Sequence, residues 1–178
     1  MDIPVYLVAG FLDAGKTNFI NGILEDGFAR EDKTLLICCE EGDTEYDPEL
    51  LKKTNTILVN VESMDEISPE RLTELELLHN PERVLMEWNG MWNQDELRLP
   101  KDWEVYQQIT IIDGSTFDLY VKNMKPLLGA MVRNSELIIC NRCDDVEDLE
   151  GYRRTLLAMN NQAEIVFCLL YTSPSPRD

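Results

Sequence analysis

Gly10-Phe11-Leu12-Asp13-Ala14-Gly15-Lys16-Thr17 is the most informative segment of this sequence. It matches G-x-x-x-x-G-K-[ST] in full, follows an apolar run at residues 5–9 and precedes a helical pattern at residues 18–24. In that context the glycines let the backbone curve around an anion, and the N–H groups at the start of the helix point toward it. The pattern therefore predicts a phosphate-binding loop between a strand and a helix.

The residues of this loop have separate expected roles toward a nucleotide. Lys16 can reach the β- and γ-phosphates and support catalysis, and the Thr17 hydroxyl can be a ligand of Mg²⁺. The other residues expected to contact the nucleotide here are Gly10, Asp13, Ala14, Gly15 and Asn18. Asp13 is unusual, because it adds negative charge beside phosphates. The alternative interpretation is a glycine-rich turn that carries Lys-Thr by chance.

Short apolar, β-branched runs recur along the chain between helical patterns. They occupy residues 3–8, 34–39, 56–61, 83–88, 108–112, 136–141 and 164–167. Several are continuously apolar, as expected of strands that are covered on both faces. The sequence therefore predicts a three-layer α/β fold of the P-loop NTPase type, with a mainly parallel central sheet and ligands at the carboxyl ends of the strands.

Two of the expected helices have recognisable starts. Ser68-Pro69-Glu70 offers an N-cap, a proline in the first turn and an early acidic residue. Ser115-Thr116-Phe117-Asp118 resembles a capping box at the start of the second helix. Pro126 should kink or interrupt this second helix.

Composition limits the class of partner. The 178 residues are 44% hydrophobic, which suits one globular domain, and carry 34 acidic against 16 basic side chains, a net charge of −18. Long-range repulsion argues against nucleic acid and against an anionic membrane as partners. No apolar run approaches the roughly 20 residues that span a bilayer, and the N-terminus lacks a basic leader. We therefore expect a cytoplasmic protein with reduced cysteines.

The last residues differ from everything before them. Residues 168–178 read Cys-Leu-Leu-Tyr-Thr-Ser-Pro-Ser-Pro-Arg-Asp, without periodicity, and resemble a translated sequencing adapter. We expect residues 1–167 to form a domain that is incomplete at its C-terminal side. Residues 168–178 are expected to be a non-native or disordered tail that adds nothing to the fold.

An acidic residue, Glu87, ends the apolar strand at residues 84–86. In a parallel sheet it would face the phosphate loop, where it could hold the Mg²⁺ hydration shell together with Thr17 or orient a water molecule. Gly90 would let the following loop move when the γ-phosphate leaves. The alternative is a solvated acid at a strand end.

A second polar segment follows the apolar strand at residues 137–140. The Asp144 carboxylate can accept hydrogen bonds from the N1–H and amine of guanine, which adenine cannot donate in the same pattern. Asn141 can brace the neighbouring loops, and the planar Arg142 guanidinium can stack on the base. The alternative is an Asx turn after a strand.

The cysteines and tryptophans allow functional and structural interpretations. Four thiols, Cys38, Cys39, Cys140 and Cys143, could in principle bind Zn²⁺, but small buried side chains explain them better, with Cys39 and Cys143 nearest the solvent. Trp88, Trp92 and Trp103 gather around the loop after Glu87, where they could contact a partner or pack into the core.

Together these segments resemble those of the CobW family of P-loop GTPases, relatives of the urease and hydrogenase nickel-insertion GTPases. Family members typically carry a G-F-L-G-x-G-K-T-T loop, an N-E-F-G segment followed by an aspartate, a strand end E-x-x-G and an N-K-x-D guanine motif. The corresponding segments here are residues 10–18, Cys39-Glu40-Glu41-Gly42 with Asp47, Glu87-Trp88-Asn89-Gly90 and Asn141-Arg142-Cys143-Asp144. The order and spacing agree over about the first 167 residues.

The resemblance implies a switch that slowly hydrolyses GTP to GDP and phosphate with Mg²⁺ and assists metal or cofactor delivery to a client metalloprotein or cofactor enzyme, with a homodimer as one assembly. It implies that Glu40, with Glu41 and Asp47, lies in a switch segment and can position the attacking water. Members often carry a G-C-I-C-C metal motif after the third strand, whereas this chain has Leu58-Val59-Asn60-Val61-Glu62. The resemblance therefore does not extend to that metal site.

Two other functions remain open at this point. One is a nucleotide-dependent sensor or interaction protein without significant turnover, and the other is an ATP-using P-loop enzyme. A turnover assay distinguishes the sensor from a GTPase. A preference for adenine over guanine nucleotides would distinguish the ATP-using enzyme from a GTPase.

Overall fold

Seven parallel strands form one central sheet in the computed structural model, which describes residues 2–27, 31–39 and 45–168. The strands are β1 (Ile3–Ala9), β2 (Thr34–Cys38), β3 (Thr56–Asn60), β4 (Arg83–Glu87), β5 (Trp103–Asp113), β6 (Leu137–Asn141) and β7 (Glu164–Phe167). Their order in the sheet is β3-β2-β4-β1-β5-β6-β7, and each neighbouring pair is parallel. The expected α/β fold with a parallel central sheet is confirmed.

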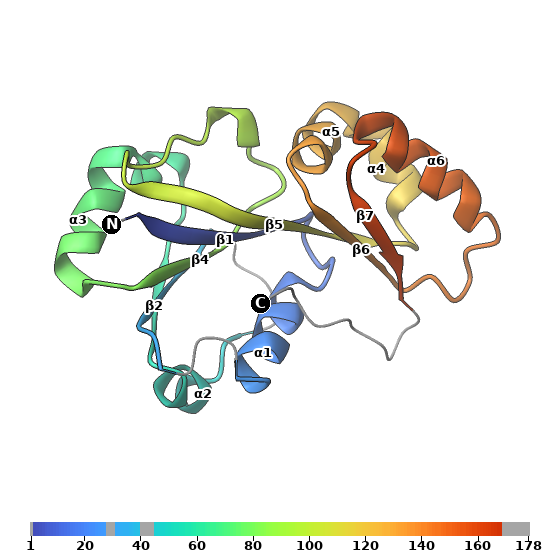
Figure 1. The fold of residues 1–178 in the computed structure, drawn as a ribbon. Coiled ribbons are helices and arrows are strands. Elements are labelled where there is room, and N and C mark those ends of the chain that lie inside the picture. The colour runs from blue at the N-terminus through green and yellow to red at the C-terminus, as the bar shows by residue number, and fades with distance from the viewer. Residues whose placement is uncertain (1, 28–30, 40–44, 169–178) are drawn as a thin grey trace.

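Helices cover both faces of this sheet and complete the three layers (Figure 1). The helices are α1 (Lys16–Glu25), α2 (Pro48–Lys53), α3 (Pro69–His79), α4 (Phe117–Asn123), α5 (Lys125–Arg133) and α6 (Leu149–Met159), with two short 3₁₀ turns, η1 (Met64–Ile67) and η2 (Gln94–Glu96). Helices α1 and α2 lie on one face, and α3 to α6 lie on the other. Among the described residues, no helix has the length and hydrophobicity of a membrane span.

The two faces bury separate apolar cores because successive side chains of a strand point in opposite directions. In β1, Val5, Leu7 and Ala9 join the core under α3 to α6, whereas Val8 joins the core under α1 and α2. A strand that is apolar on both faces can lie only between two layers of helices. This alternation explains why β1 lies in the middle layer, between the two layers of helices.

Strand β5 is longer than the expected residues 108–112. It begins at Trp103, and the side chains of Glu104, Val105 and Tyr106 are exposed before the buried run starts at Gln107. The exposed half pairs with β1 through main-chain hydrogen bonds, which do not depend on an apolar pattern. An irregular register between Val5 and Tyr6 of β1 accommodates this pairing.

Two expectations about helix ends have different outcomes. The capping box at Ser115 is wrong, because α4 begins at Phe117 after Thr116, whose side chain makes no capping bond. The Ser115 hydroxyl instead donates to Asp113, at 2.6 Å between the oxygens. Pro126 lies in the first turn of α5, and Met124 separates this helix from α4. The expected interruption of the helix is therefore present.

Strand β7 ends at Phe167 as expected, but the folded part of the chain continues for one more residue. Cys168, which we assigned to the tail, is buried, and its N–H donates to the Cys140 carbonyl at 2.8 Å, continuing the pairing of β7 with β6. Its carbonyl accepts from the N–H of Cys143 at 3.4 Å. The folded part therefore includes Cys168, and residues 169–178 lie outside the described residues.

Candidate functional site

The loop between β1 and α1 curves as its glycine positions require. Gly10 has φ 154° and Gly15 has φ 107°, backbone angles that residues with a Cβ rarely adopt. Asp13 also lies in the left-handed region, at φ 63°. Gly15 immediately precedes the first residue of α1, so the N–H groups at the start of that helix face the space enclosed by residues 10–17, which we call the phosphate loop.

Lys16 lies inside this loop rather than in solvent. Its side chain is 3% exposed, and its Nζ donates to the carbonyl oxygen of Gly10 at 2.5 Å. An anion bound in the loop would therefore meet a lysine that is already held next to it. Ala14 is also buried, whereas the side chains of Asp13 and Asn18 are exposed.

Glu87 lies at the end of β4, next to the start of α1. The residue is 2% exposed, and its Oε1 accepts a hydrogen bond from the Thr17 hydroxyl at 2.6 Å. A hydroxyl and a carboxylate are hard oxygen donors of the kind that Mg²⁺ prefers beside a phosphate. The structure thus brings together the two residues that we expect to serve the metal, and their chemistry fits the ion.

The other oxygen of Glu87 has partners that the sequence did not indicate. Oε2 accepts from the Tyr46 hydroxyl at 2.5 Å and from the Cys38 thiol at 3.3 Å. Burial, followed by the negative charge of Glu87, raises the pKa of Tyr46 well above its usual value, so the phenol keeps the proton that it donates. No spacing or motif singles out Tyr46 in the sequence.

Gly90 packs directly against the phosphate loop. Its N–H donates to the Gly10 carbonyl at 3.1 Å, and a Cβ added at Gly90 would lie 2.5 Å from that same oxygen. The sequence suggested that Gly90 provides mobility. The structure adds a second reason for a glycine here, because the absence of a side chain allows two backbones to approach closely.

Arg142 joins the segment after β6 to the phosphate loop. Its NH1 donates to the Asp13 carbonyl and to Asp113 Oδ2, each at 2.7 Å. The residue has φ 55°, a conformation in which its side chain reaches back across the carboxyl ends of β1 and β5. The Asn141 amide also lies next to this loop, since a Cβ on Gly15 would be 3.3 Å from its Nδ2.

An open depression lies beside this link, at the carboxyl ends of β5 and β6. Its lining residues are Gly114, Ser115, Asp118, Arg142, Asp144, Asp145, Val146, Glu147, Asp148 and Tyr152. Burial, and then the charge of Asp118, raise the pKa of Tyr152 to about 12, and its hydroxyl donates to Asp118 Oδ2 at 3.2 Å. Asp144 and Arg142 therefore share one surface that opens next to the phosphate loop.

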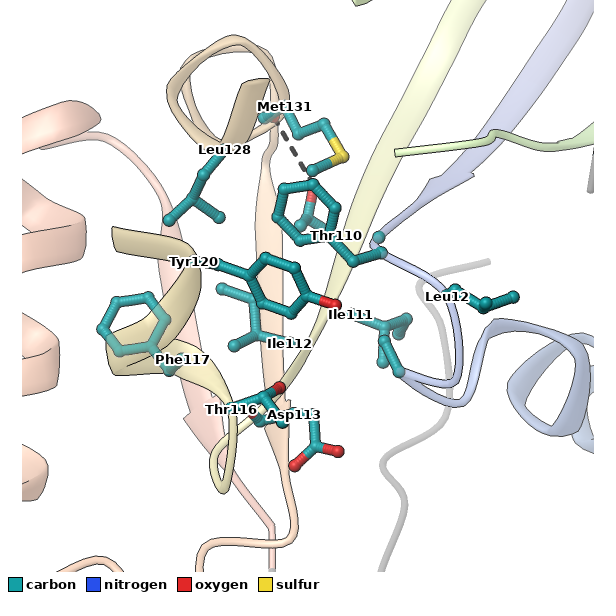
Figure 2. A pocket seen from close by; sticks show the side chains of 13 residues that line it. Leu12, Thr110, Ile111, Ile112, Asp113, Thr116, Phe117, Tyr120, Leu128 and Met131 are labelled. Atoms are coloured by element: carbon teal, nitrogen blue, oxygen red, sulfur yellow. Dashed lines mark hydrogen bonds between the residues drawn. The ribbon is translucent and has the colours of Figure 1, made fainter. Parts of the chain in front are cut away.

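A second pocket, behind the phosphate loop, is apolar (Figure 2). The Phe11 ring stacks on Tyr120 of α4, with 4.0 Å between centroids and 12° between planes. Leu128 and Met131 of α5 also line this pocket. The Thr110 hydroxyl donates to the Met131 carbonyl, as the dashed line in Figure 2 marks. These contacts hold the loop against β5 and α4, and they offer nothing to a phosphate.

The expected exposure of two cysteines is wrong. Cys39 is 1% exposed and Cys143 is 4% exposed. Burial raises the pKa of Cys143, and more strongly that of Cys140, which keeps both as thiols. Cys38 and Cys39 belong to different cores, and within residues 2–27, 31–39 and 45–168 no three His, Cys, Asp or Glu side chains form a metal-binding group.

The tryptophans pack into the core rather than into a surface cluster. Trp88 is fully buried with Trp92 against it edge-on, at 5.7 Å between centroids. Trp103 is also buried, and its Nε1 donates to Glu76 of α3 at 2.6 Å.

The candidates for positioning water are only partly described. Asp47 caps the N-terminus of α2 by accepting from the Glu49 N–H at 3.0 Å. Glu40 and Glu41 lie outside the described residues.

Comparison with known proteins gives a consistent result. The nucleotide-binding domain of the CobW/HypB/UreG family matches residues 4–167. The Zn(II)-bound YjiA GTPase from E. coli has a similar structure, with a TM-score of 0.66 at 19% identity, covering 93% of this chain and 57% of that one. HypB from Archaeoglobus fulgidus, a hydrogenase maturation factor, gives 0.65 at 17% identity, covering 95% and 82%.

HypB from Helicobacter pylori, solved in complex with nickel, gives a TM-score of 0.58 at 13% identity, covering 96% of this chain and 80% of that one. At these identities the similarity shows the fold alone. The chain spans little more than half of the E. coli protein, 57% of its length. No curated protein sequence matches significantly.

Proposed function

Because the chain belongs to the CobW/HypB/UreG family of nucleotide-binding domains, we propose that it binds GTP with Mg²⁺ and slowly hydrolyses it to GDP and phosphate. The observation that carries the proposal is the hydrogen bond from Arg142 NH1 to the Asp13 carbonyl, 2.7 Å long. It joins the phosphate loop to the segment that bears Asp144, so a phosphate group and a base fit on one continuous surface.

The phosphates are assigned to the loop and its lysine. Lys16 would exchange the Gly10 carbonyl for the β- and γ-phosphate oxygens, while N–H groups at the start of α1 would donate to the same anion. Because Lys16 is buried, this charge acts where water screens it little. Lys16 is therefore placed to stabilise the charge that develops when the γ-phosphate leaves.

Thr17 and Glu87 would hold Mg²⁺, which neutralises phosphate charge when it is bound. Glu87 keeps the Thr17 hydroxyl oriented through its Oε1. We assign the orientation of the attacking water to Glu40 on the family pattern, with Glu87 as its partner in the hydrolytic step. The Asp13 side chain is exposed to solvent, so an acid can be tolerated there at the edge of the triphosphate.

Guanine is assigned to Asp144. Its carboxylate lines the open depression, where it can accept from the N1–H and amine of the base. Arg142 lines the same depression and can cover one face of the base, and Asn141 braces the loop against Gly15.

The wider role that we propose is assistance in metal or cofactor delivery to a client enzyme in the cytoplasm, by a domain formed by the first 167 residues or their homodimer. The solved relatives include a Zn(II)-bound GTPase and a nickel-bound hydrogenase maturation factor. Because the described residues of this chain hold no metal-binding group of His, Cys, Asp or Glu, the metal is expected to meet other parts of the assembly.

The proposal is tested by competition between GTP and ATP for a fluorescent guanine nucleotide, together with phosphate release. We expect GTP to compete at least roughly a hundredfold better than ATP, since adenine leaves the Asp144 carboxylate unpaired. An ATP-to-GTP ratio near one would contradict the guanine assignment, and binding without phosphate release would favour a sensor.

Lys16→Ala is the matched negative control for this assay. It removes a charge-assisted contact to the triphosphate, so we expect affinity to fall by about 2–3 kcal/mol and phosphate release to stop. A Lys16→Ala protein that binds GTP like the parent would exclude the phosphate loop as the binding site.

A further inference from the structure

The two oxygens of the Glu87 carboxylate serve different parts of the molecule. Oε1 faces the start of α1, where the Thr17 hydroxyl donates at 2.6 Å. Oε2 faces the other way and accepts from Tyr46 at 2.5 Å and from the Cys38 thiol at 3.3 Å. A carboxylate with hydrogen bonds to both oxygens cannot rotate without breaking one of them. The orientation of Glu87 toward Thr17 therefore depends on the partners of Oε2.

Tyr46 is the stronger of these two partners. A phenol is a good donor, whereas a thiol is a weak one. Tyr46 is 9% exposed and belongs to the core that α1 and α2 share with the sheet, which also includes Phe19 and Leu50. Its hydroxyl therefore reaches Glu87 from a fixed apolar position.

Tyr46 also connects Glu87 to a separate element. The next residue, Asp47, is the N-cap of α2, and its side chain accepts from the Glu49 N–H. The backbone of Tyr46 is therefore joined directly to the residue that caps α2. Thr17 at α1, Glu87 at β4 and Tyr46 before α2 form one continuous chain of hydrogen bonds.

We propose that Tyr46 is a positioning residue: its hydroxyl sets the Glu87 carboxylate for Mg²⁺ and transmits occupancy of the metal–nucleotide site to helix α2. The inference rests on the proposed function, because it assigns the metal to Thr17 and Glu87. Metal binding restrains Glu87 and Thr17, and through Tyr46 that restraint stabilises the first turn of α2.

The first experiment compares the parent with Tyr46→Phe, which keeps the ring and removes only the hydroxyl. We measure the affinity of a fluorescent GTP analogue during Mg²⁺ titration and in excess chelator. The Mg²⁺ concentration at half saturation should rise by about five- to tenfold, since a buried charged oxygen loses its main donor. Affinity in chelator should not change, because Tyr46 acts through the metal.

Tyr106→Phe is the matched control, since Tyr106 is a half-exposed tyrosine on β5, outside the site. It should leave the Mg²⁺ midpoint and the melting temperature at parental values. Equal melting temperatures for Tyr46→Phe and the parent would show that the hydroxyl matters to the metal rather than to folding.

The second experiment reads helix α2 directly. Lys52 and Lys53 are exposed trypsin sites in its last turn. In the parent, Mg²⁺ with a non-hydrolysable GTP analogue should slow cleavage at these lysines, because cleavage requires local unfolding. In Tyr46→Phe the same ligands should give little protection at saturating concentrations.

The outcomes separate the two levels of the argument. A parent that binds guanine nucleotide no better with Mg²⁺ overturns the proposed function and this inference with it. A parent that responds to Mg²⁺, beside a Tyr46→Phe protein with the same midpoint and the same α2 protection, overturns only the role of Tyr46.

Discussion

Asp144 tests the base assignment at the scale of one side chain. Asp144→Asn replaces one acceptor oxygen by an NH₂ donor, which guanine cannot satisfy but the extra carbonyl of xanthine can. We expect the ratio of GTP to XTP affinity to fall by roughly a hundredfold, measured by competition. Asp102→Asn makes the same charge change at an exposed site before β5 and should leave the ratio unaltered. An unchanged ratio in Asp144→Asn would refute base recognition by this residue.

Strand ends made some site residues predictable from sequence. Glu87 follows an apolar run, and parallel strands end at one edge, so its proximity to Thr17 could be foreseen. Tyr46 and Asp113 could not, because their roles depend on contacts with Glu87 and Arg142, which are 41 and 29 residues away in the chain. Cys39 was misjudged because the chain stays within the core under α3 to α6 for one residue beyond the end of β2.

At the scale of elements, the close approach of Gly90 to Gly10 fixes how β4 and the phosphate loop sit together. A Cβ at Gly90 would lie 2.5 Å from the Gly10 oxygen and 2.8 Å from its carbonyl carbon, both backbone atoms. Gly90→Ala should therefore lower the free energy of unfolding by about 1–3 kcal/mol and weaken nucleotide binding. Urea unfolding and the fluorescent competition assay measure the two effects.

Gly22→Ala is the control for this substitution. Gly22 lies within α1, and a Cβ there meets no atom within 4 Å. Alanine should stabilise the helix by about 0.5–1 kcal/mol. Destabilisation of equal size in both variants would show that the contact with Gly10 is not the cause.

Elements with an apolar period were foreseen, and those without one were not. The apolar half of β5 was expected, but its exposed half, with Val105 and Tyr106 at 42% and 48% exposure, carries no alternation that marks a strand. Helix α2 has six residues and no buried side chain, so its sequence shows no amphipathic pattern. Asp47 and Pro48 at its start were the only local signals.

At the scale of the whole molecule, the C-terminal boundary can be placed to one residue. A protein that ends at Cys168 should melt at the same temperature as the full chain. One that ends at Phe167 loses the bonds of Cys168 with Cys140 and Cys143 and should be less stable by about 1–2 kcal/mol. Thermal unfolding of both truncations measures this, and a lower melting temperature for the chain ending at Cys168 would show that residues 169–178 pack.

The central position of β1 has a consequence for translation. This strand is made before both of its neighbours, β4 and β5, and β5 is complete only at Asp113. Until β4 and β5 leave the ribosome, β1 is an apolar strand without partners, and the phosphate loop has no sheet behind it. Exposed apolar segments of this kind are the ones that chaperones bind. A ribosome-stalled chain that has not yet exposed residue 113 should therefore fail to retain GTP, whereas one that exposes residue 168 should retain it.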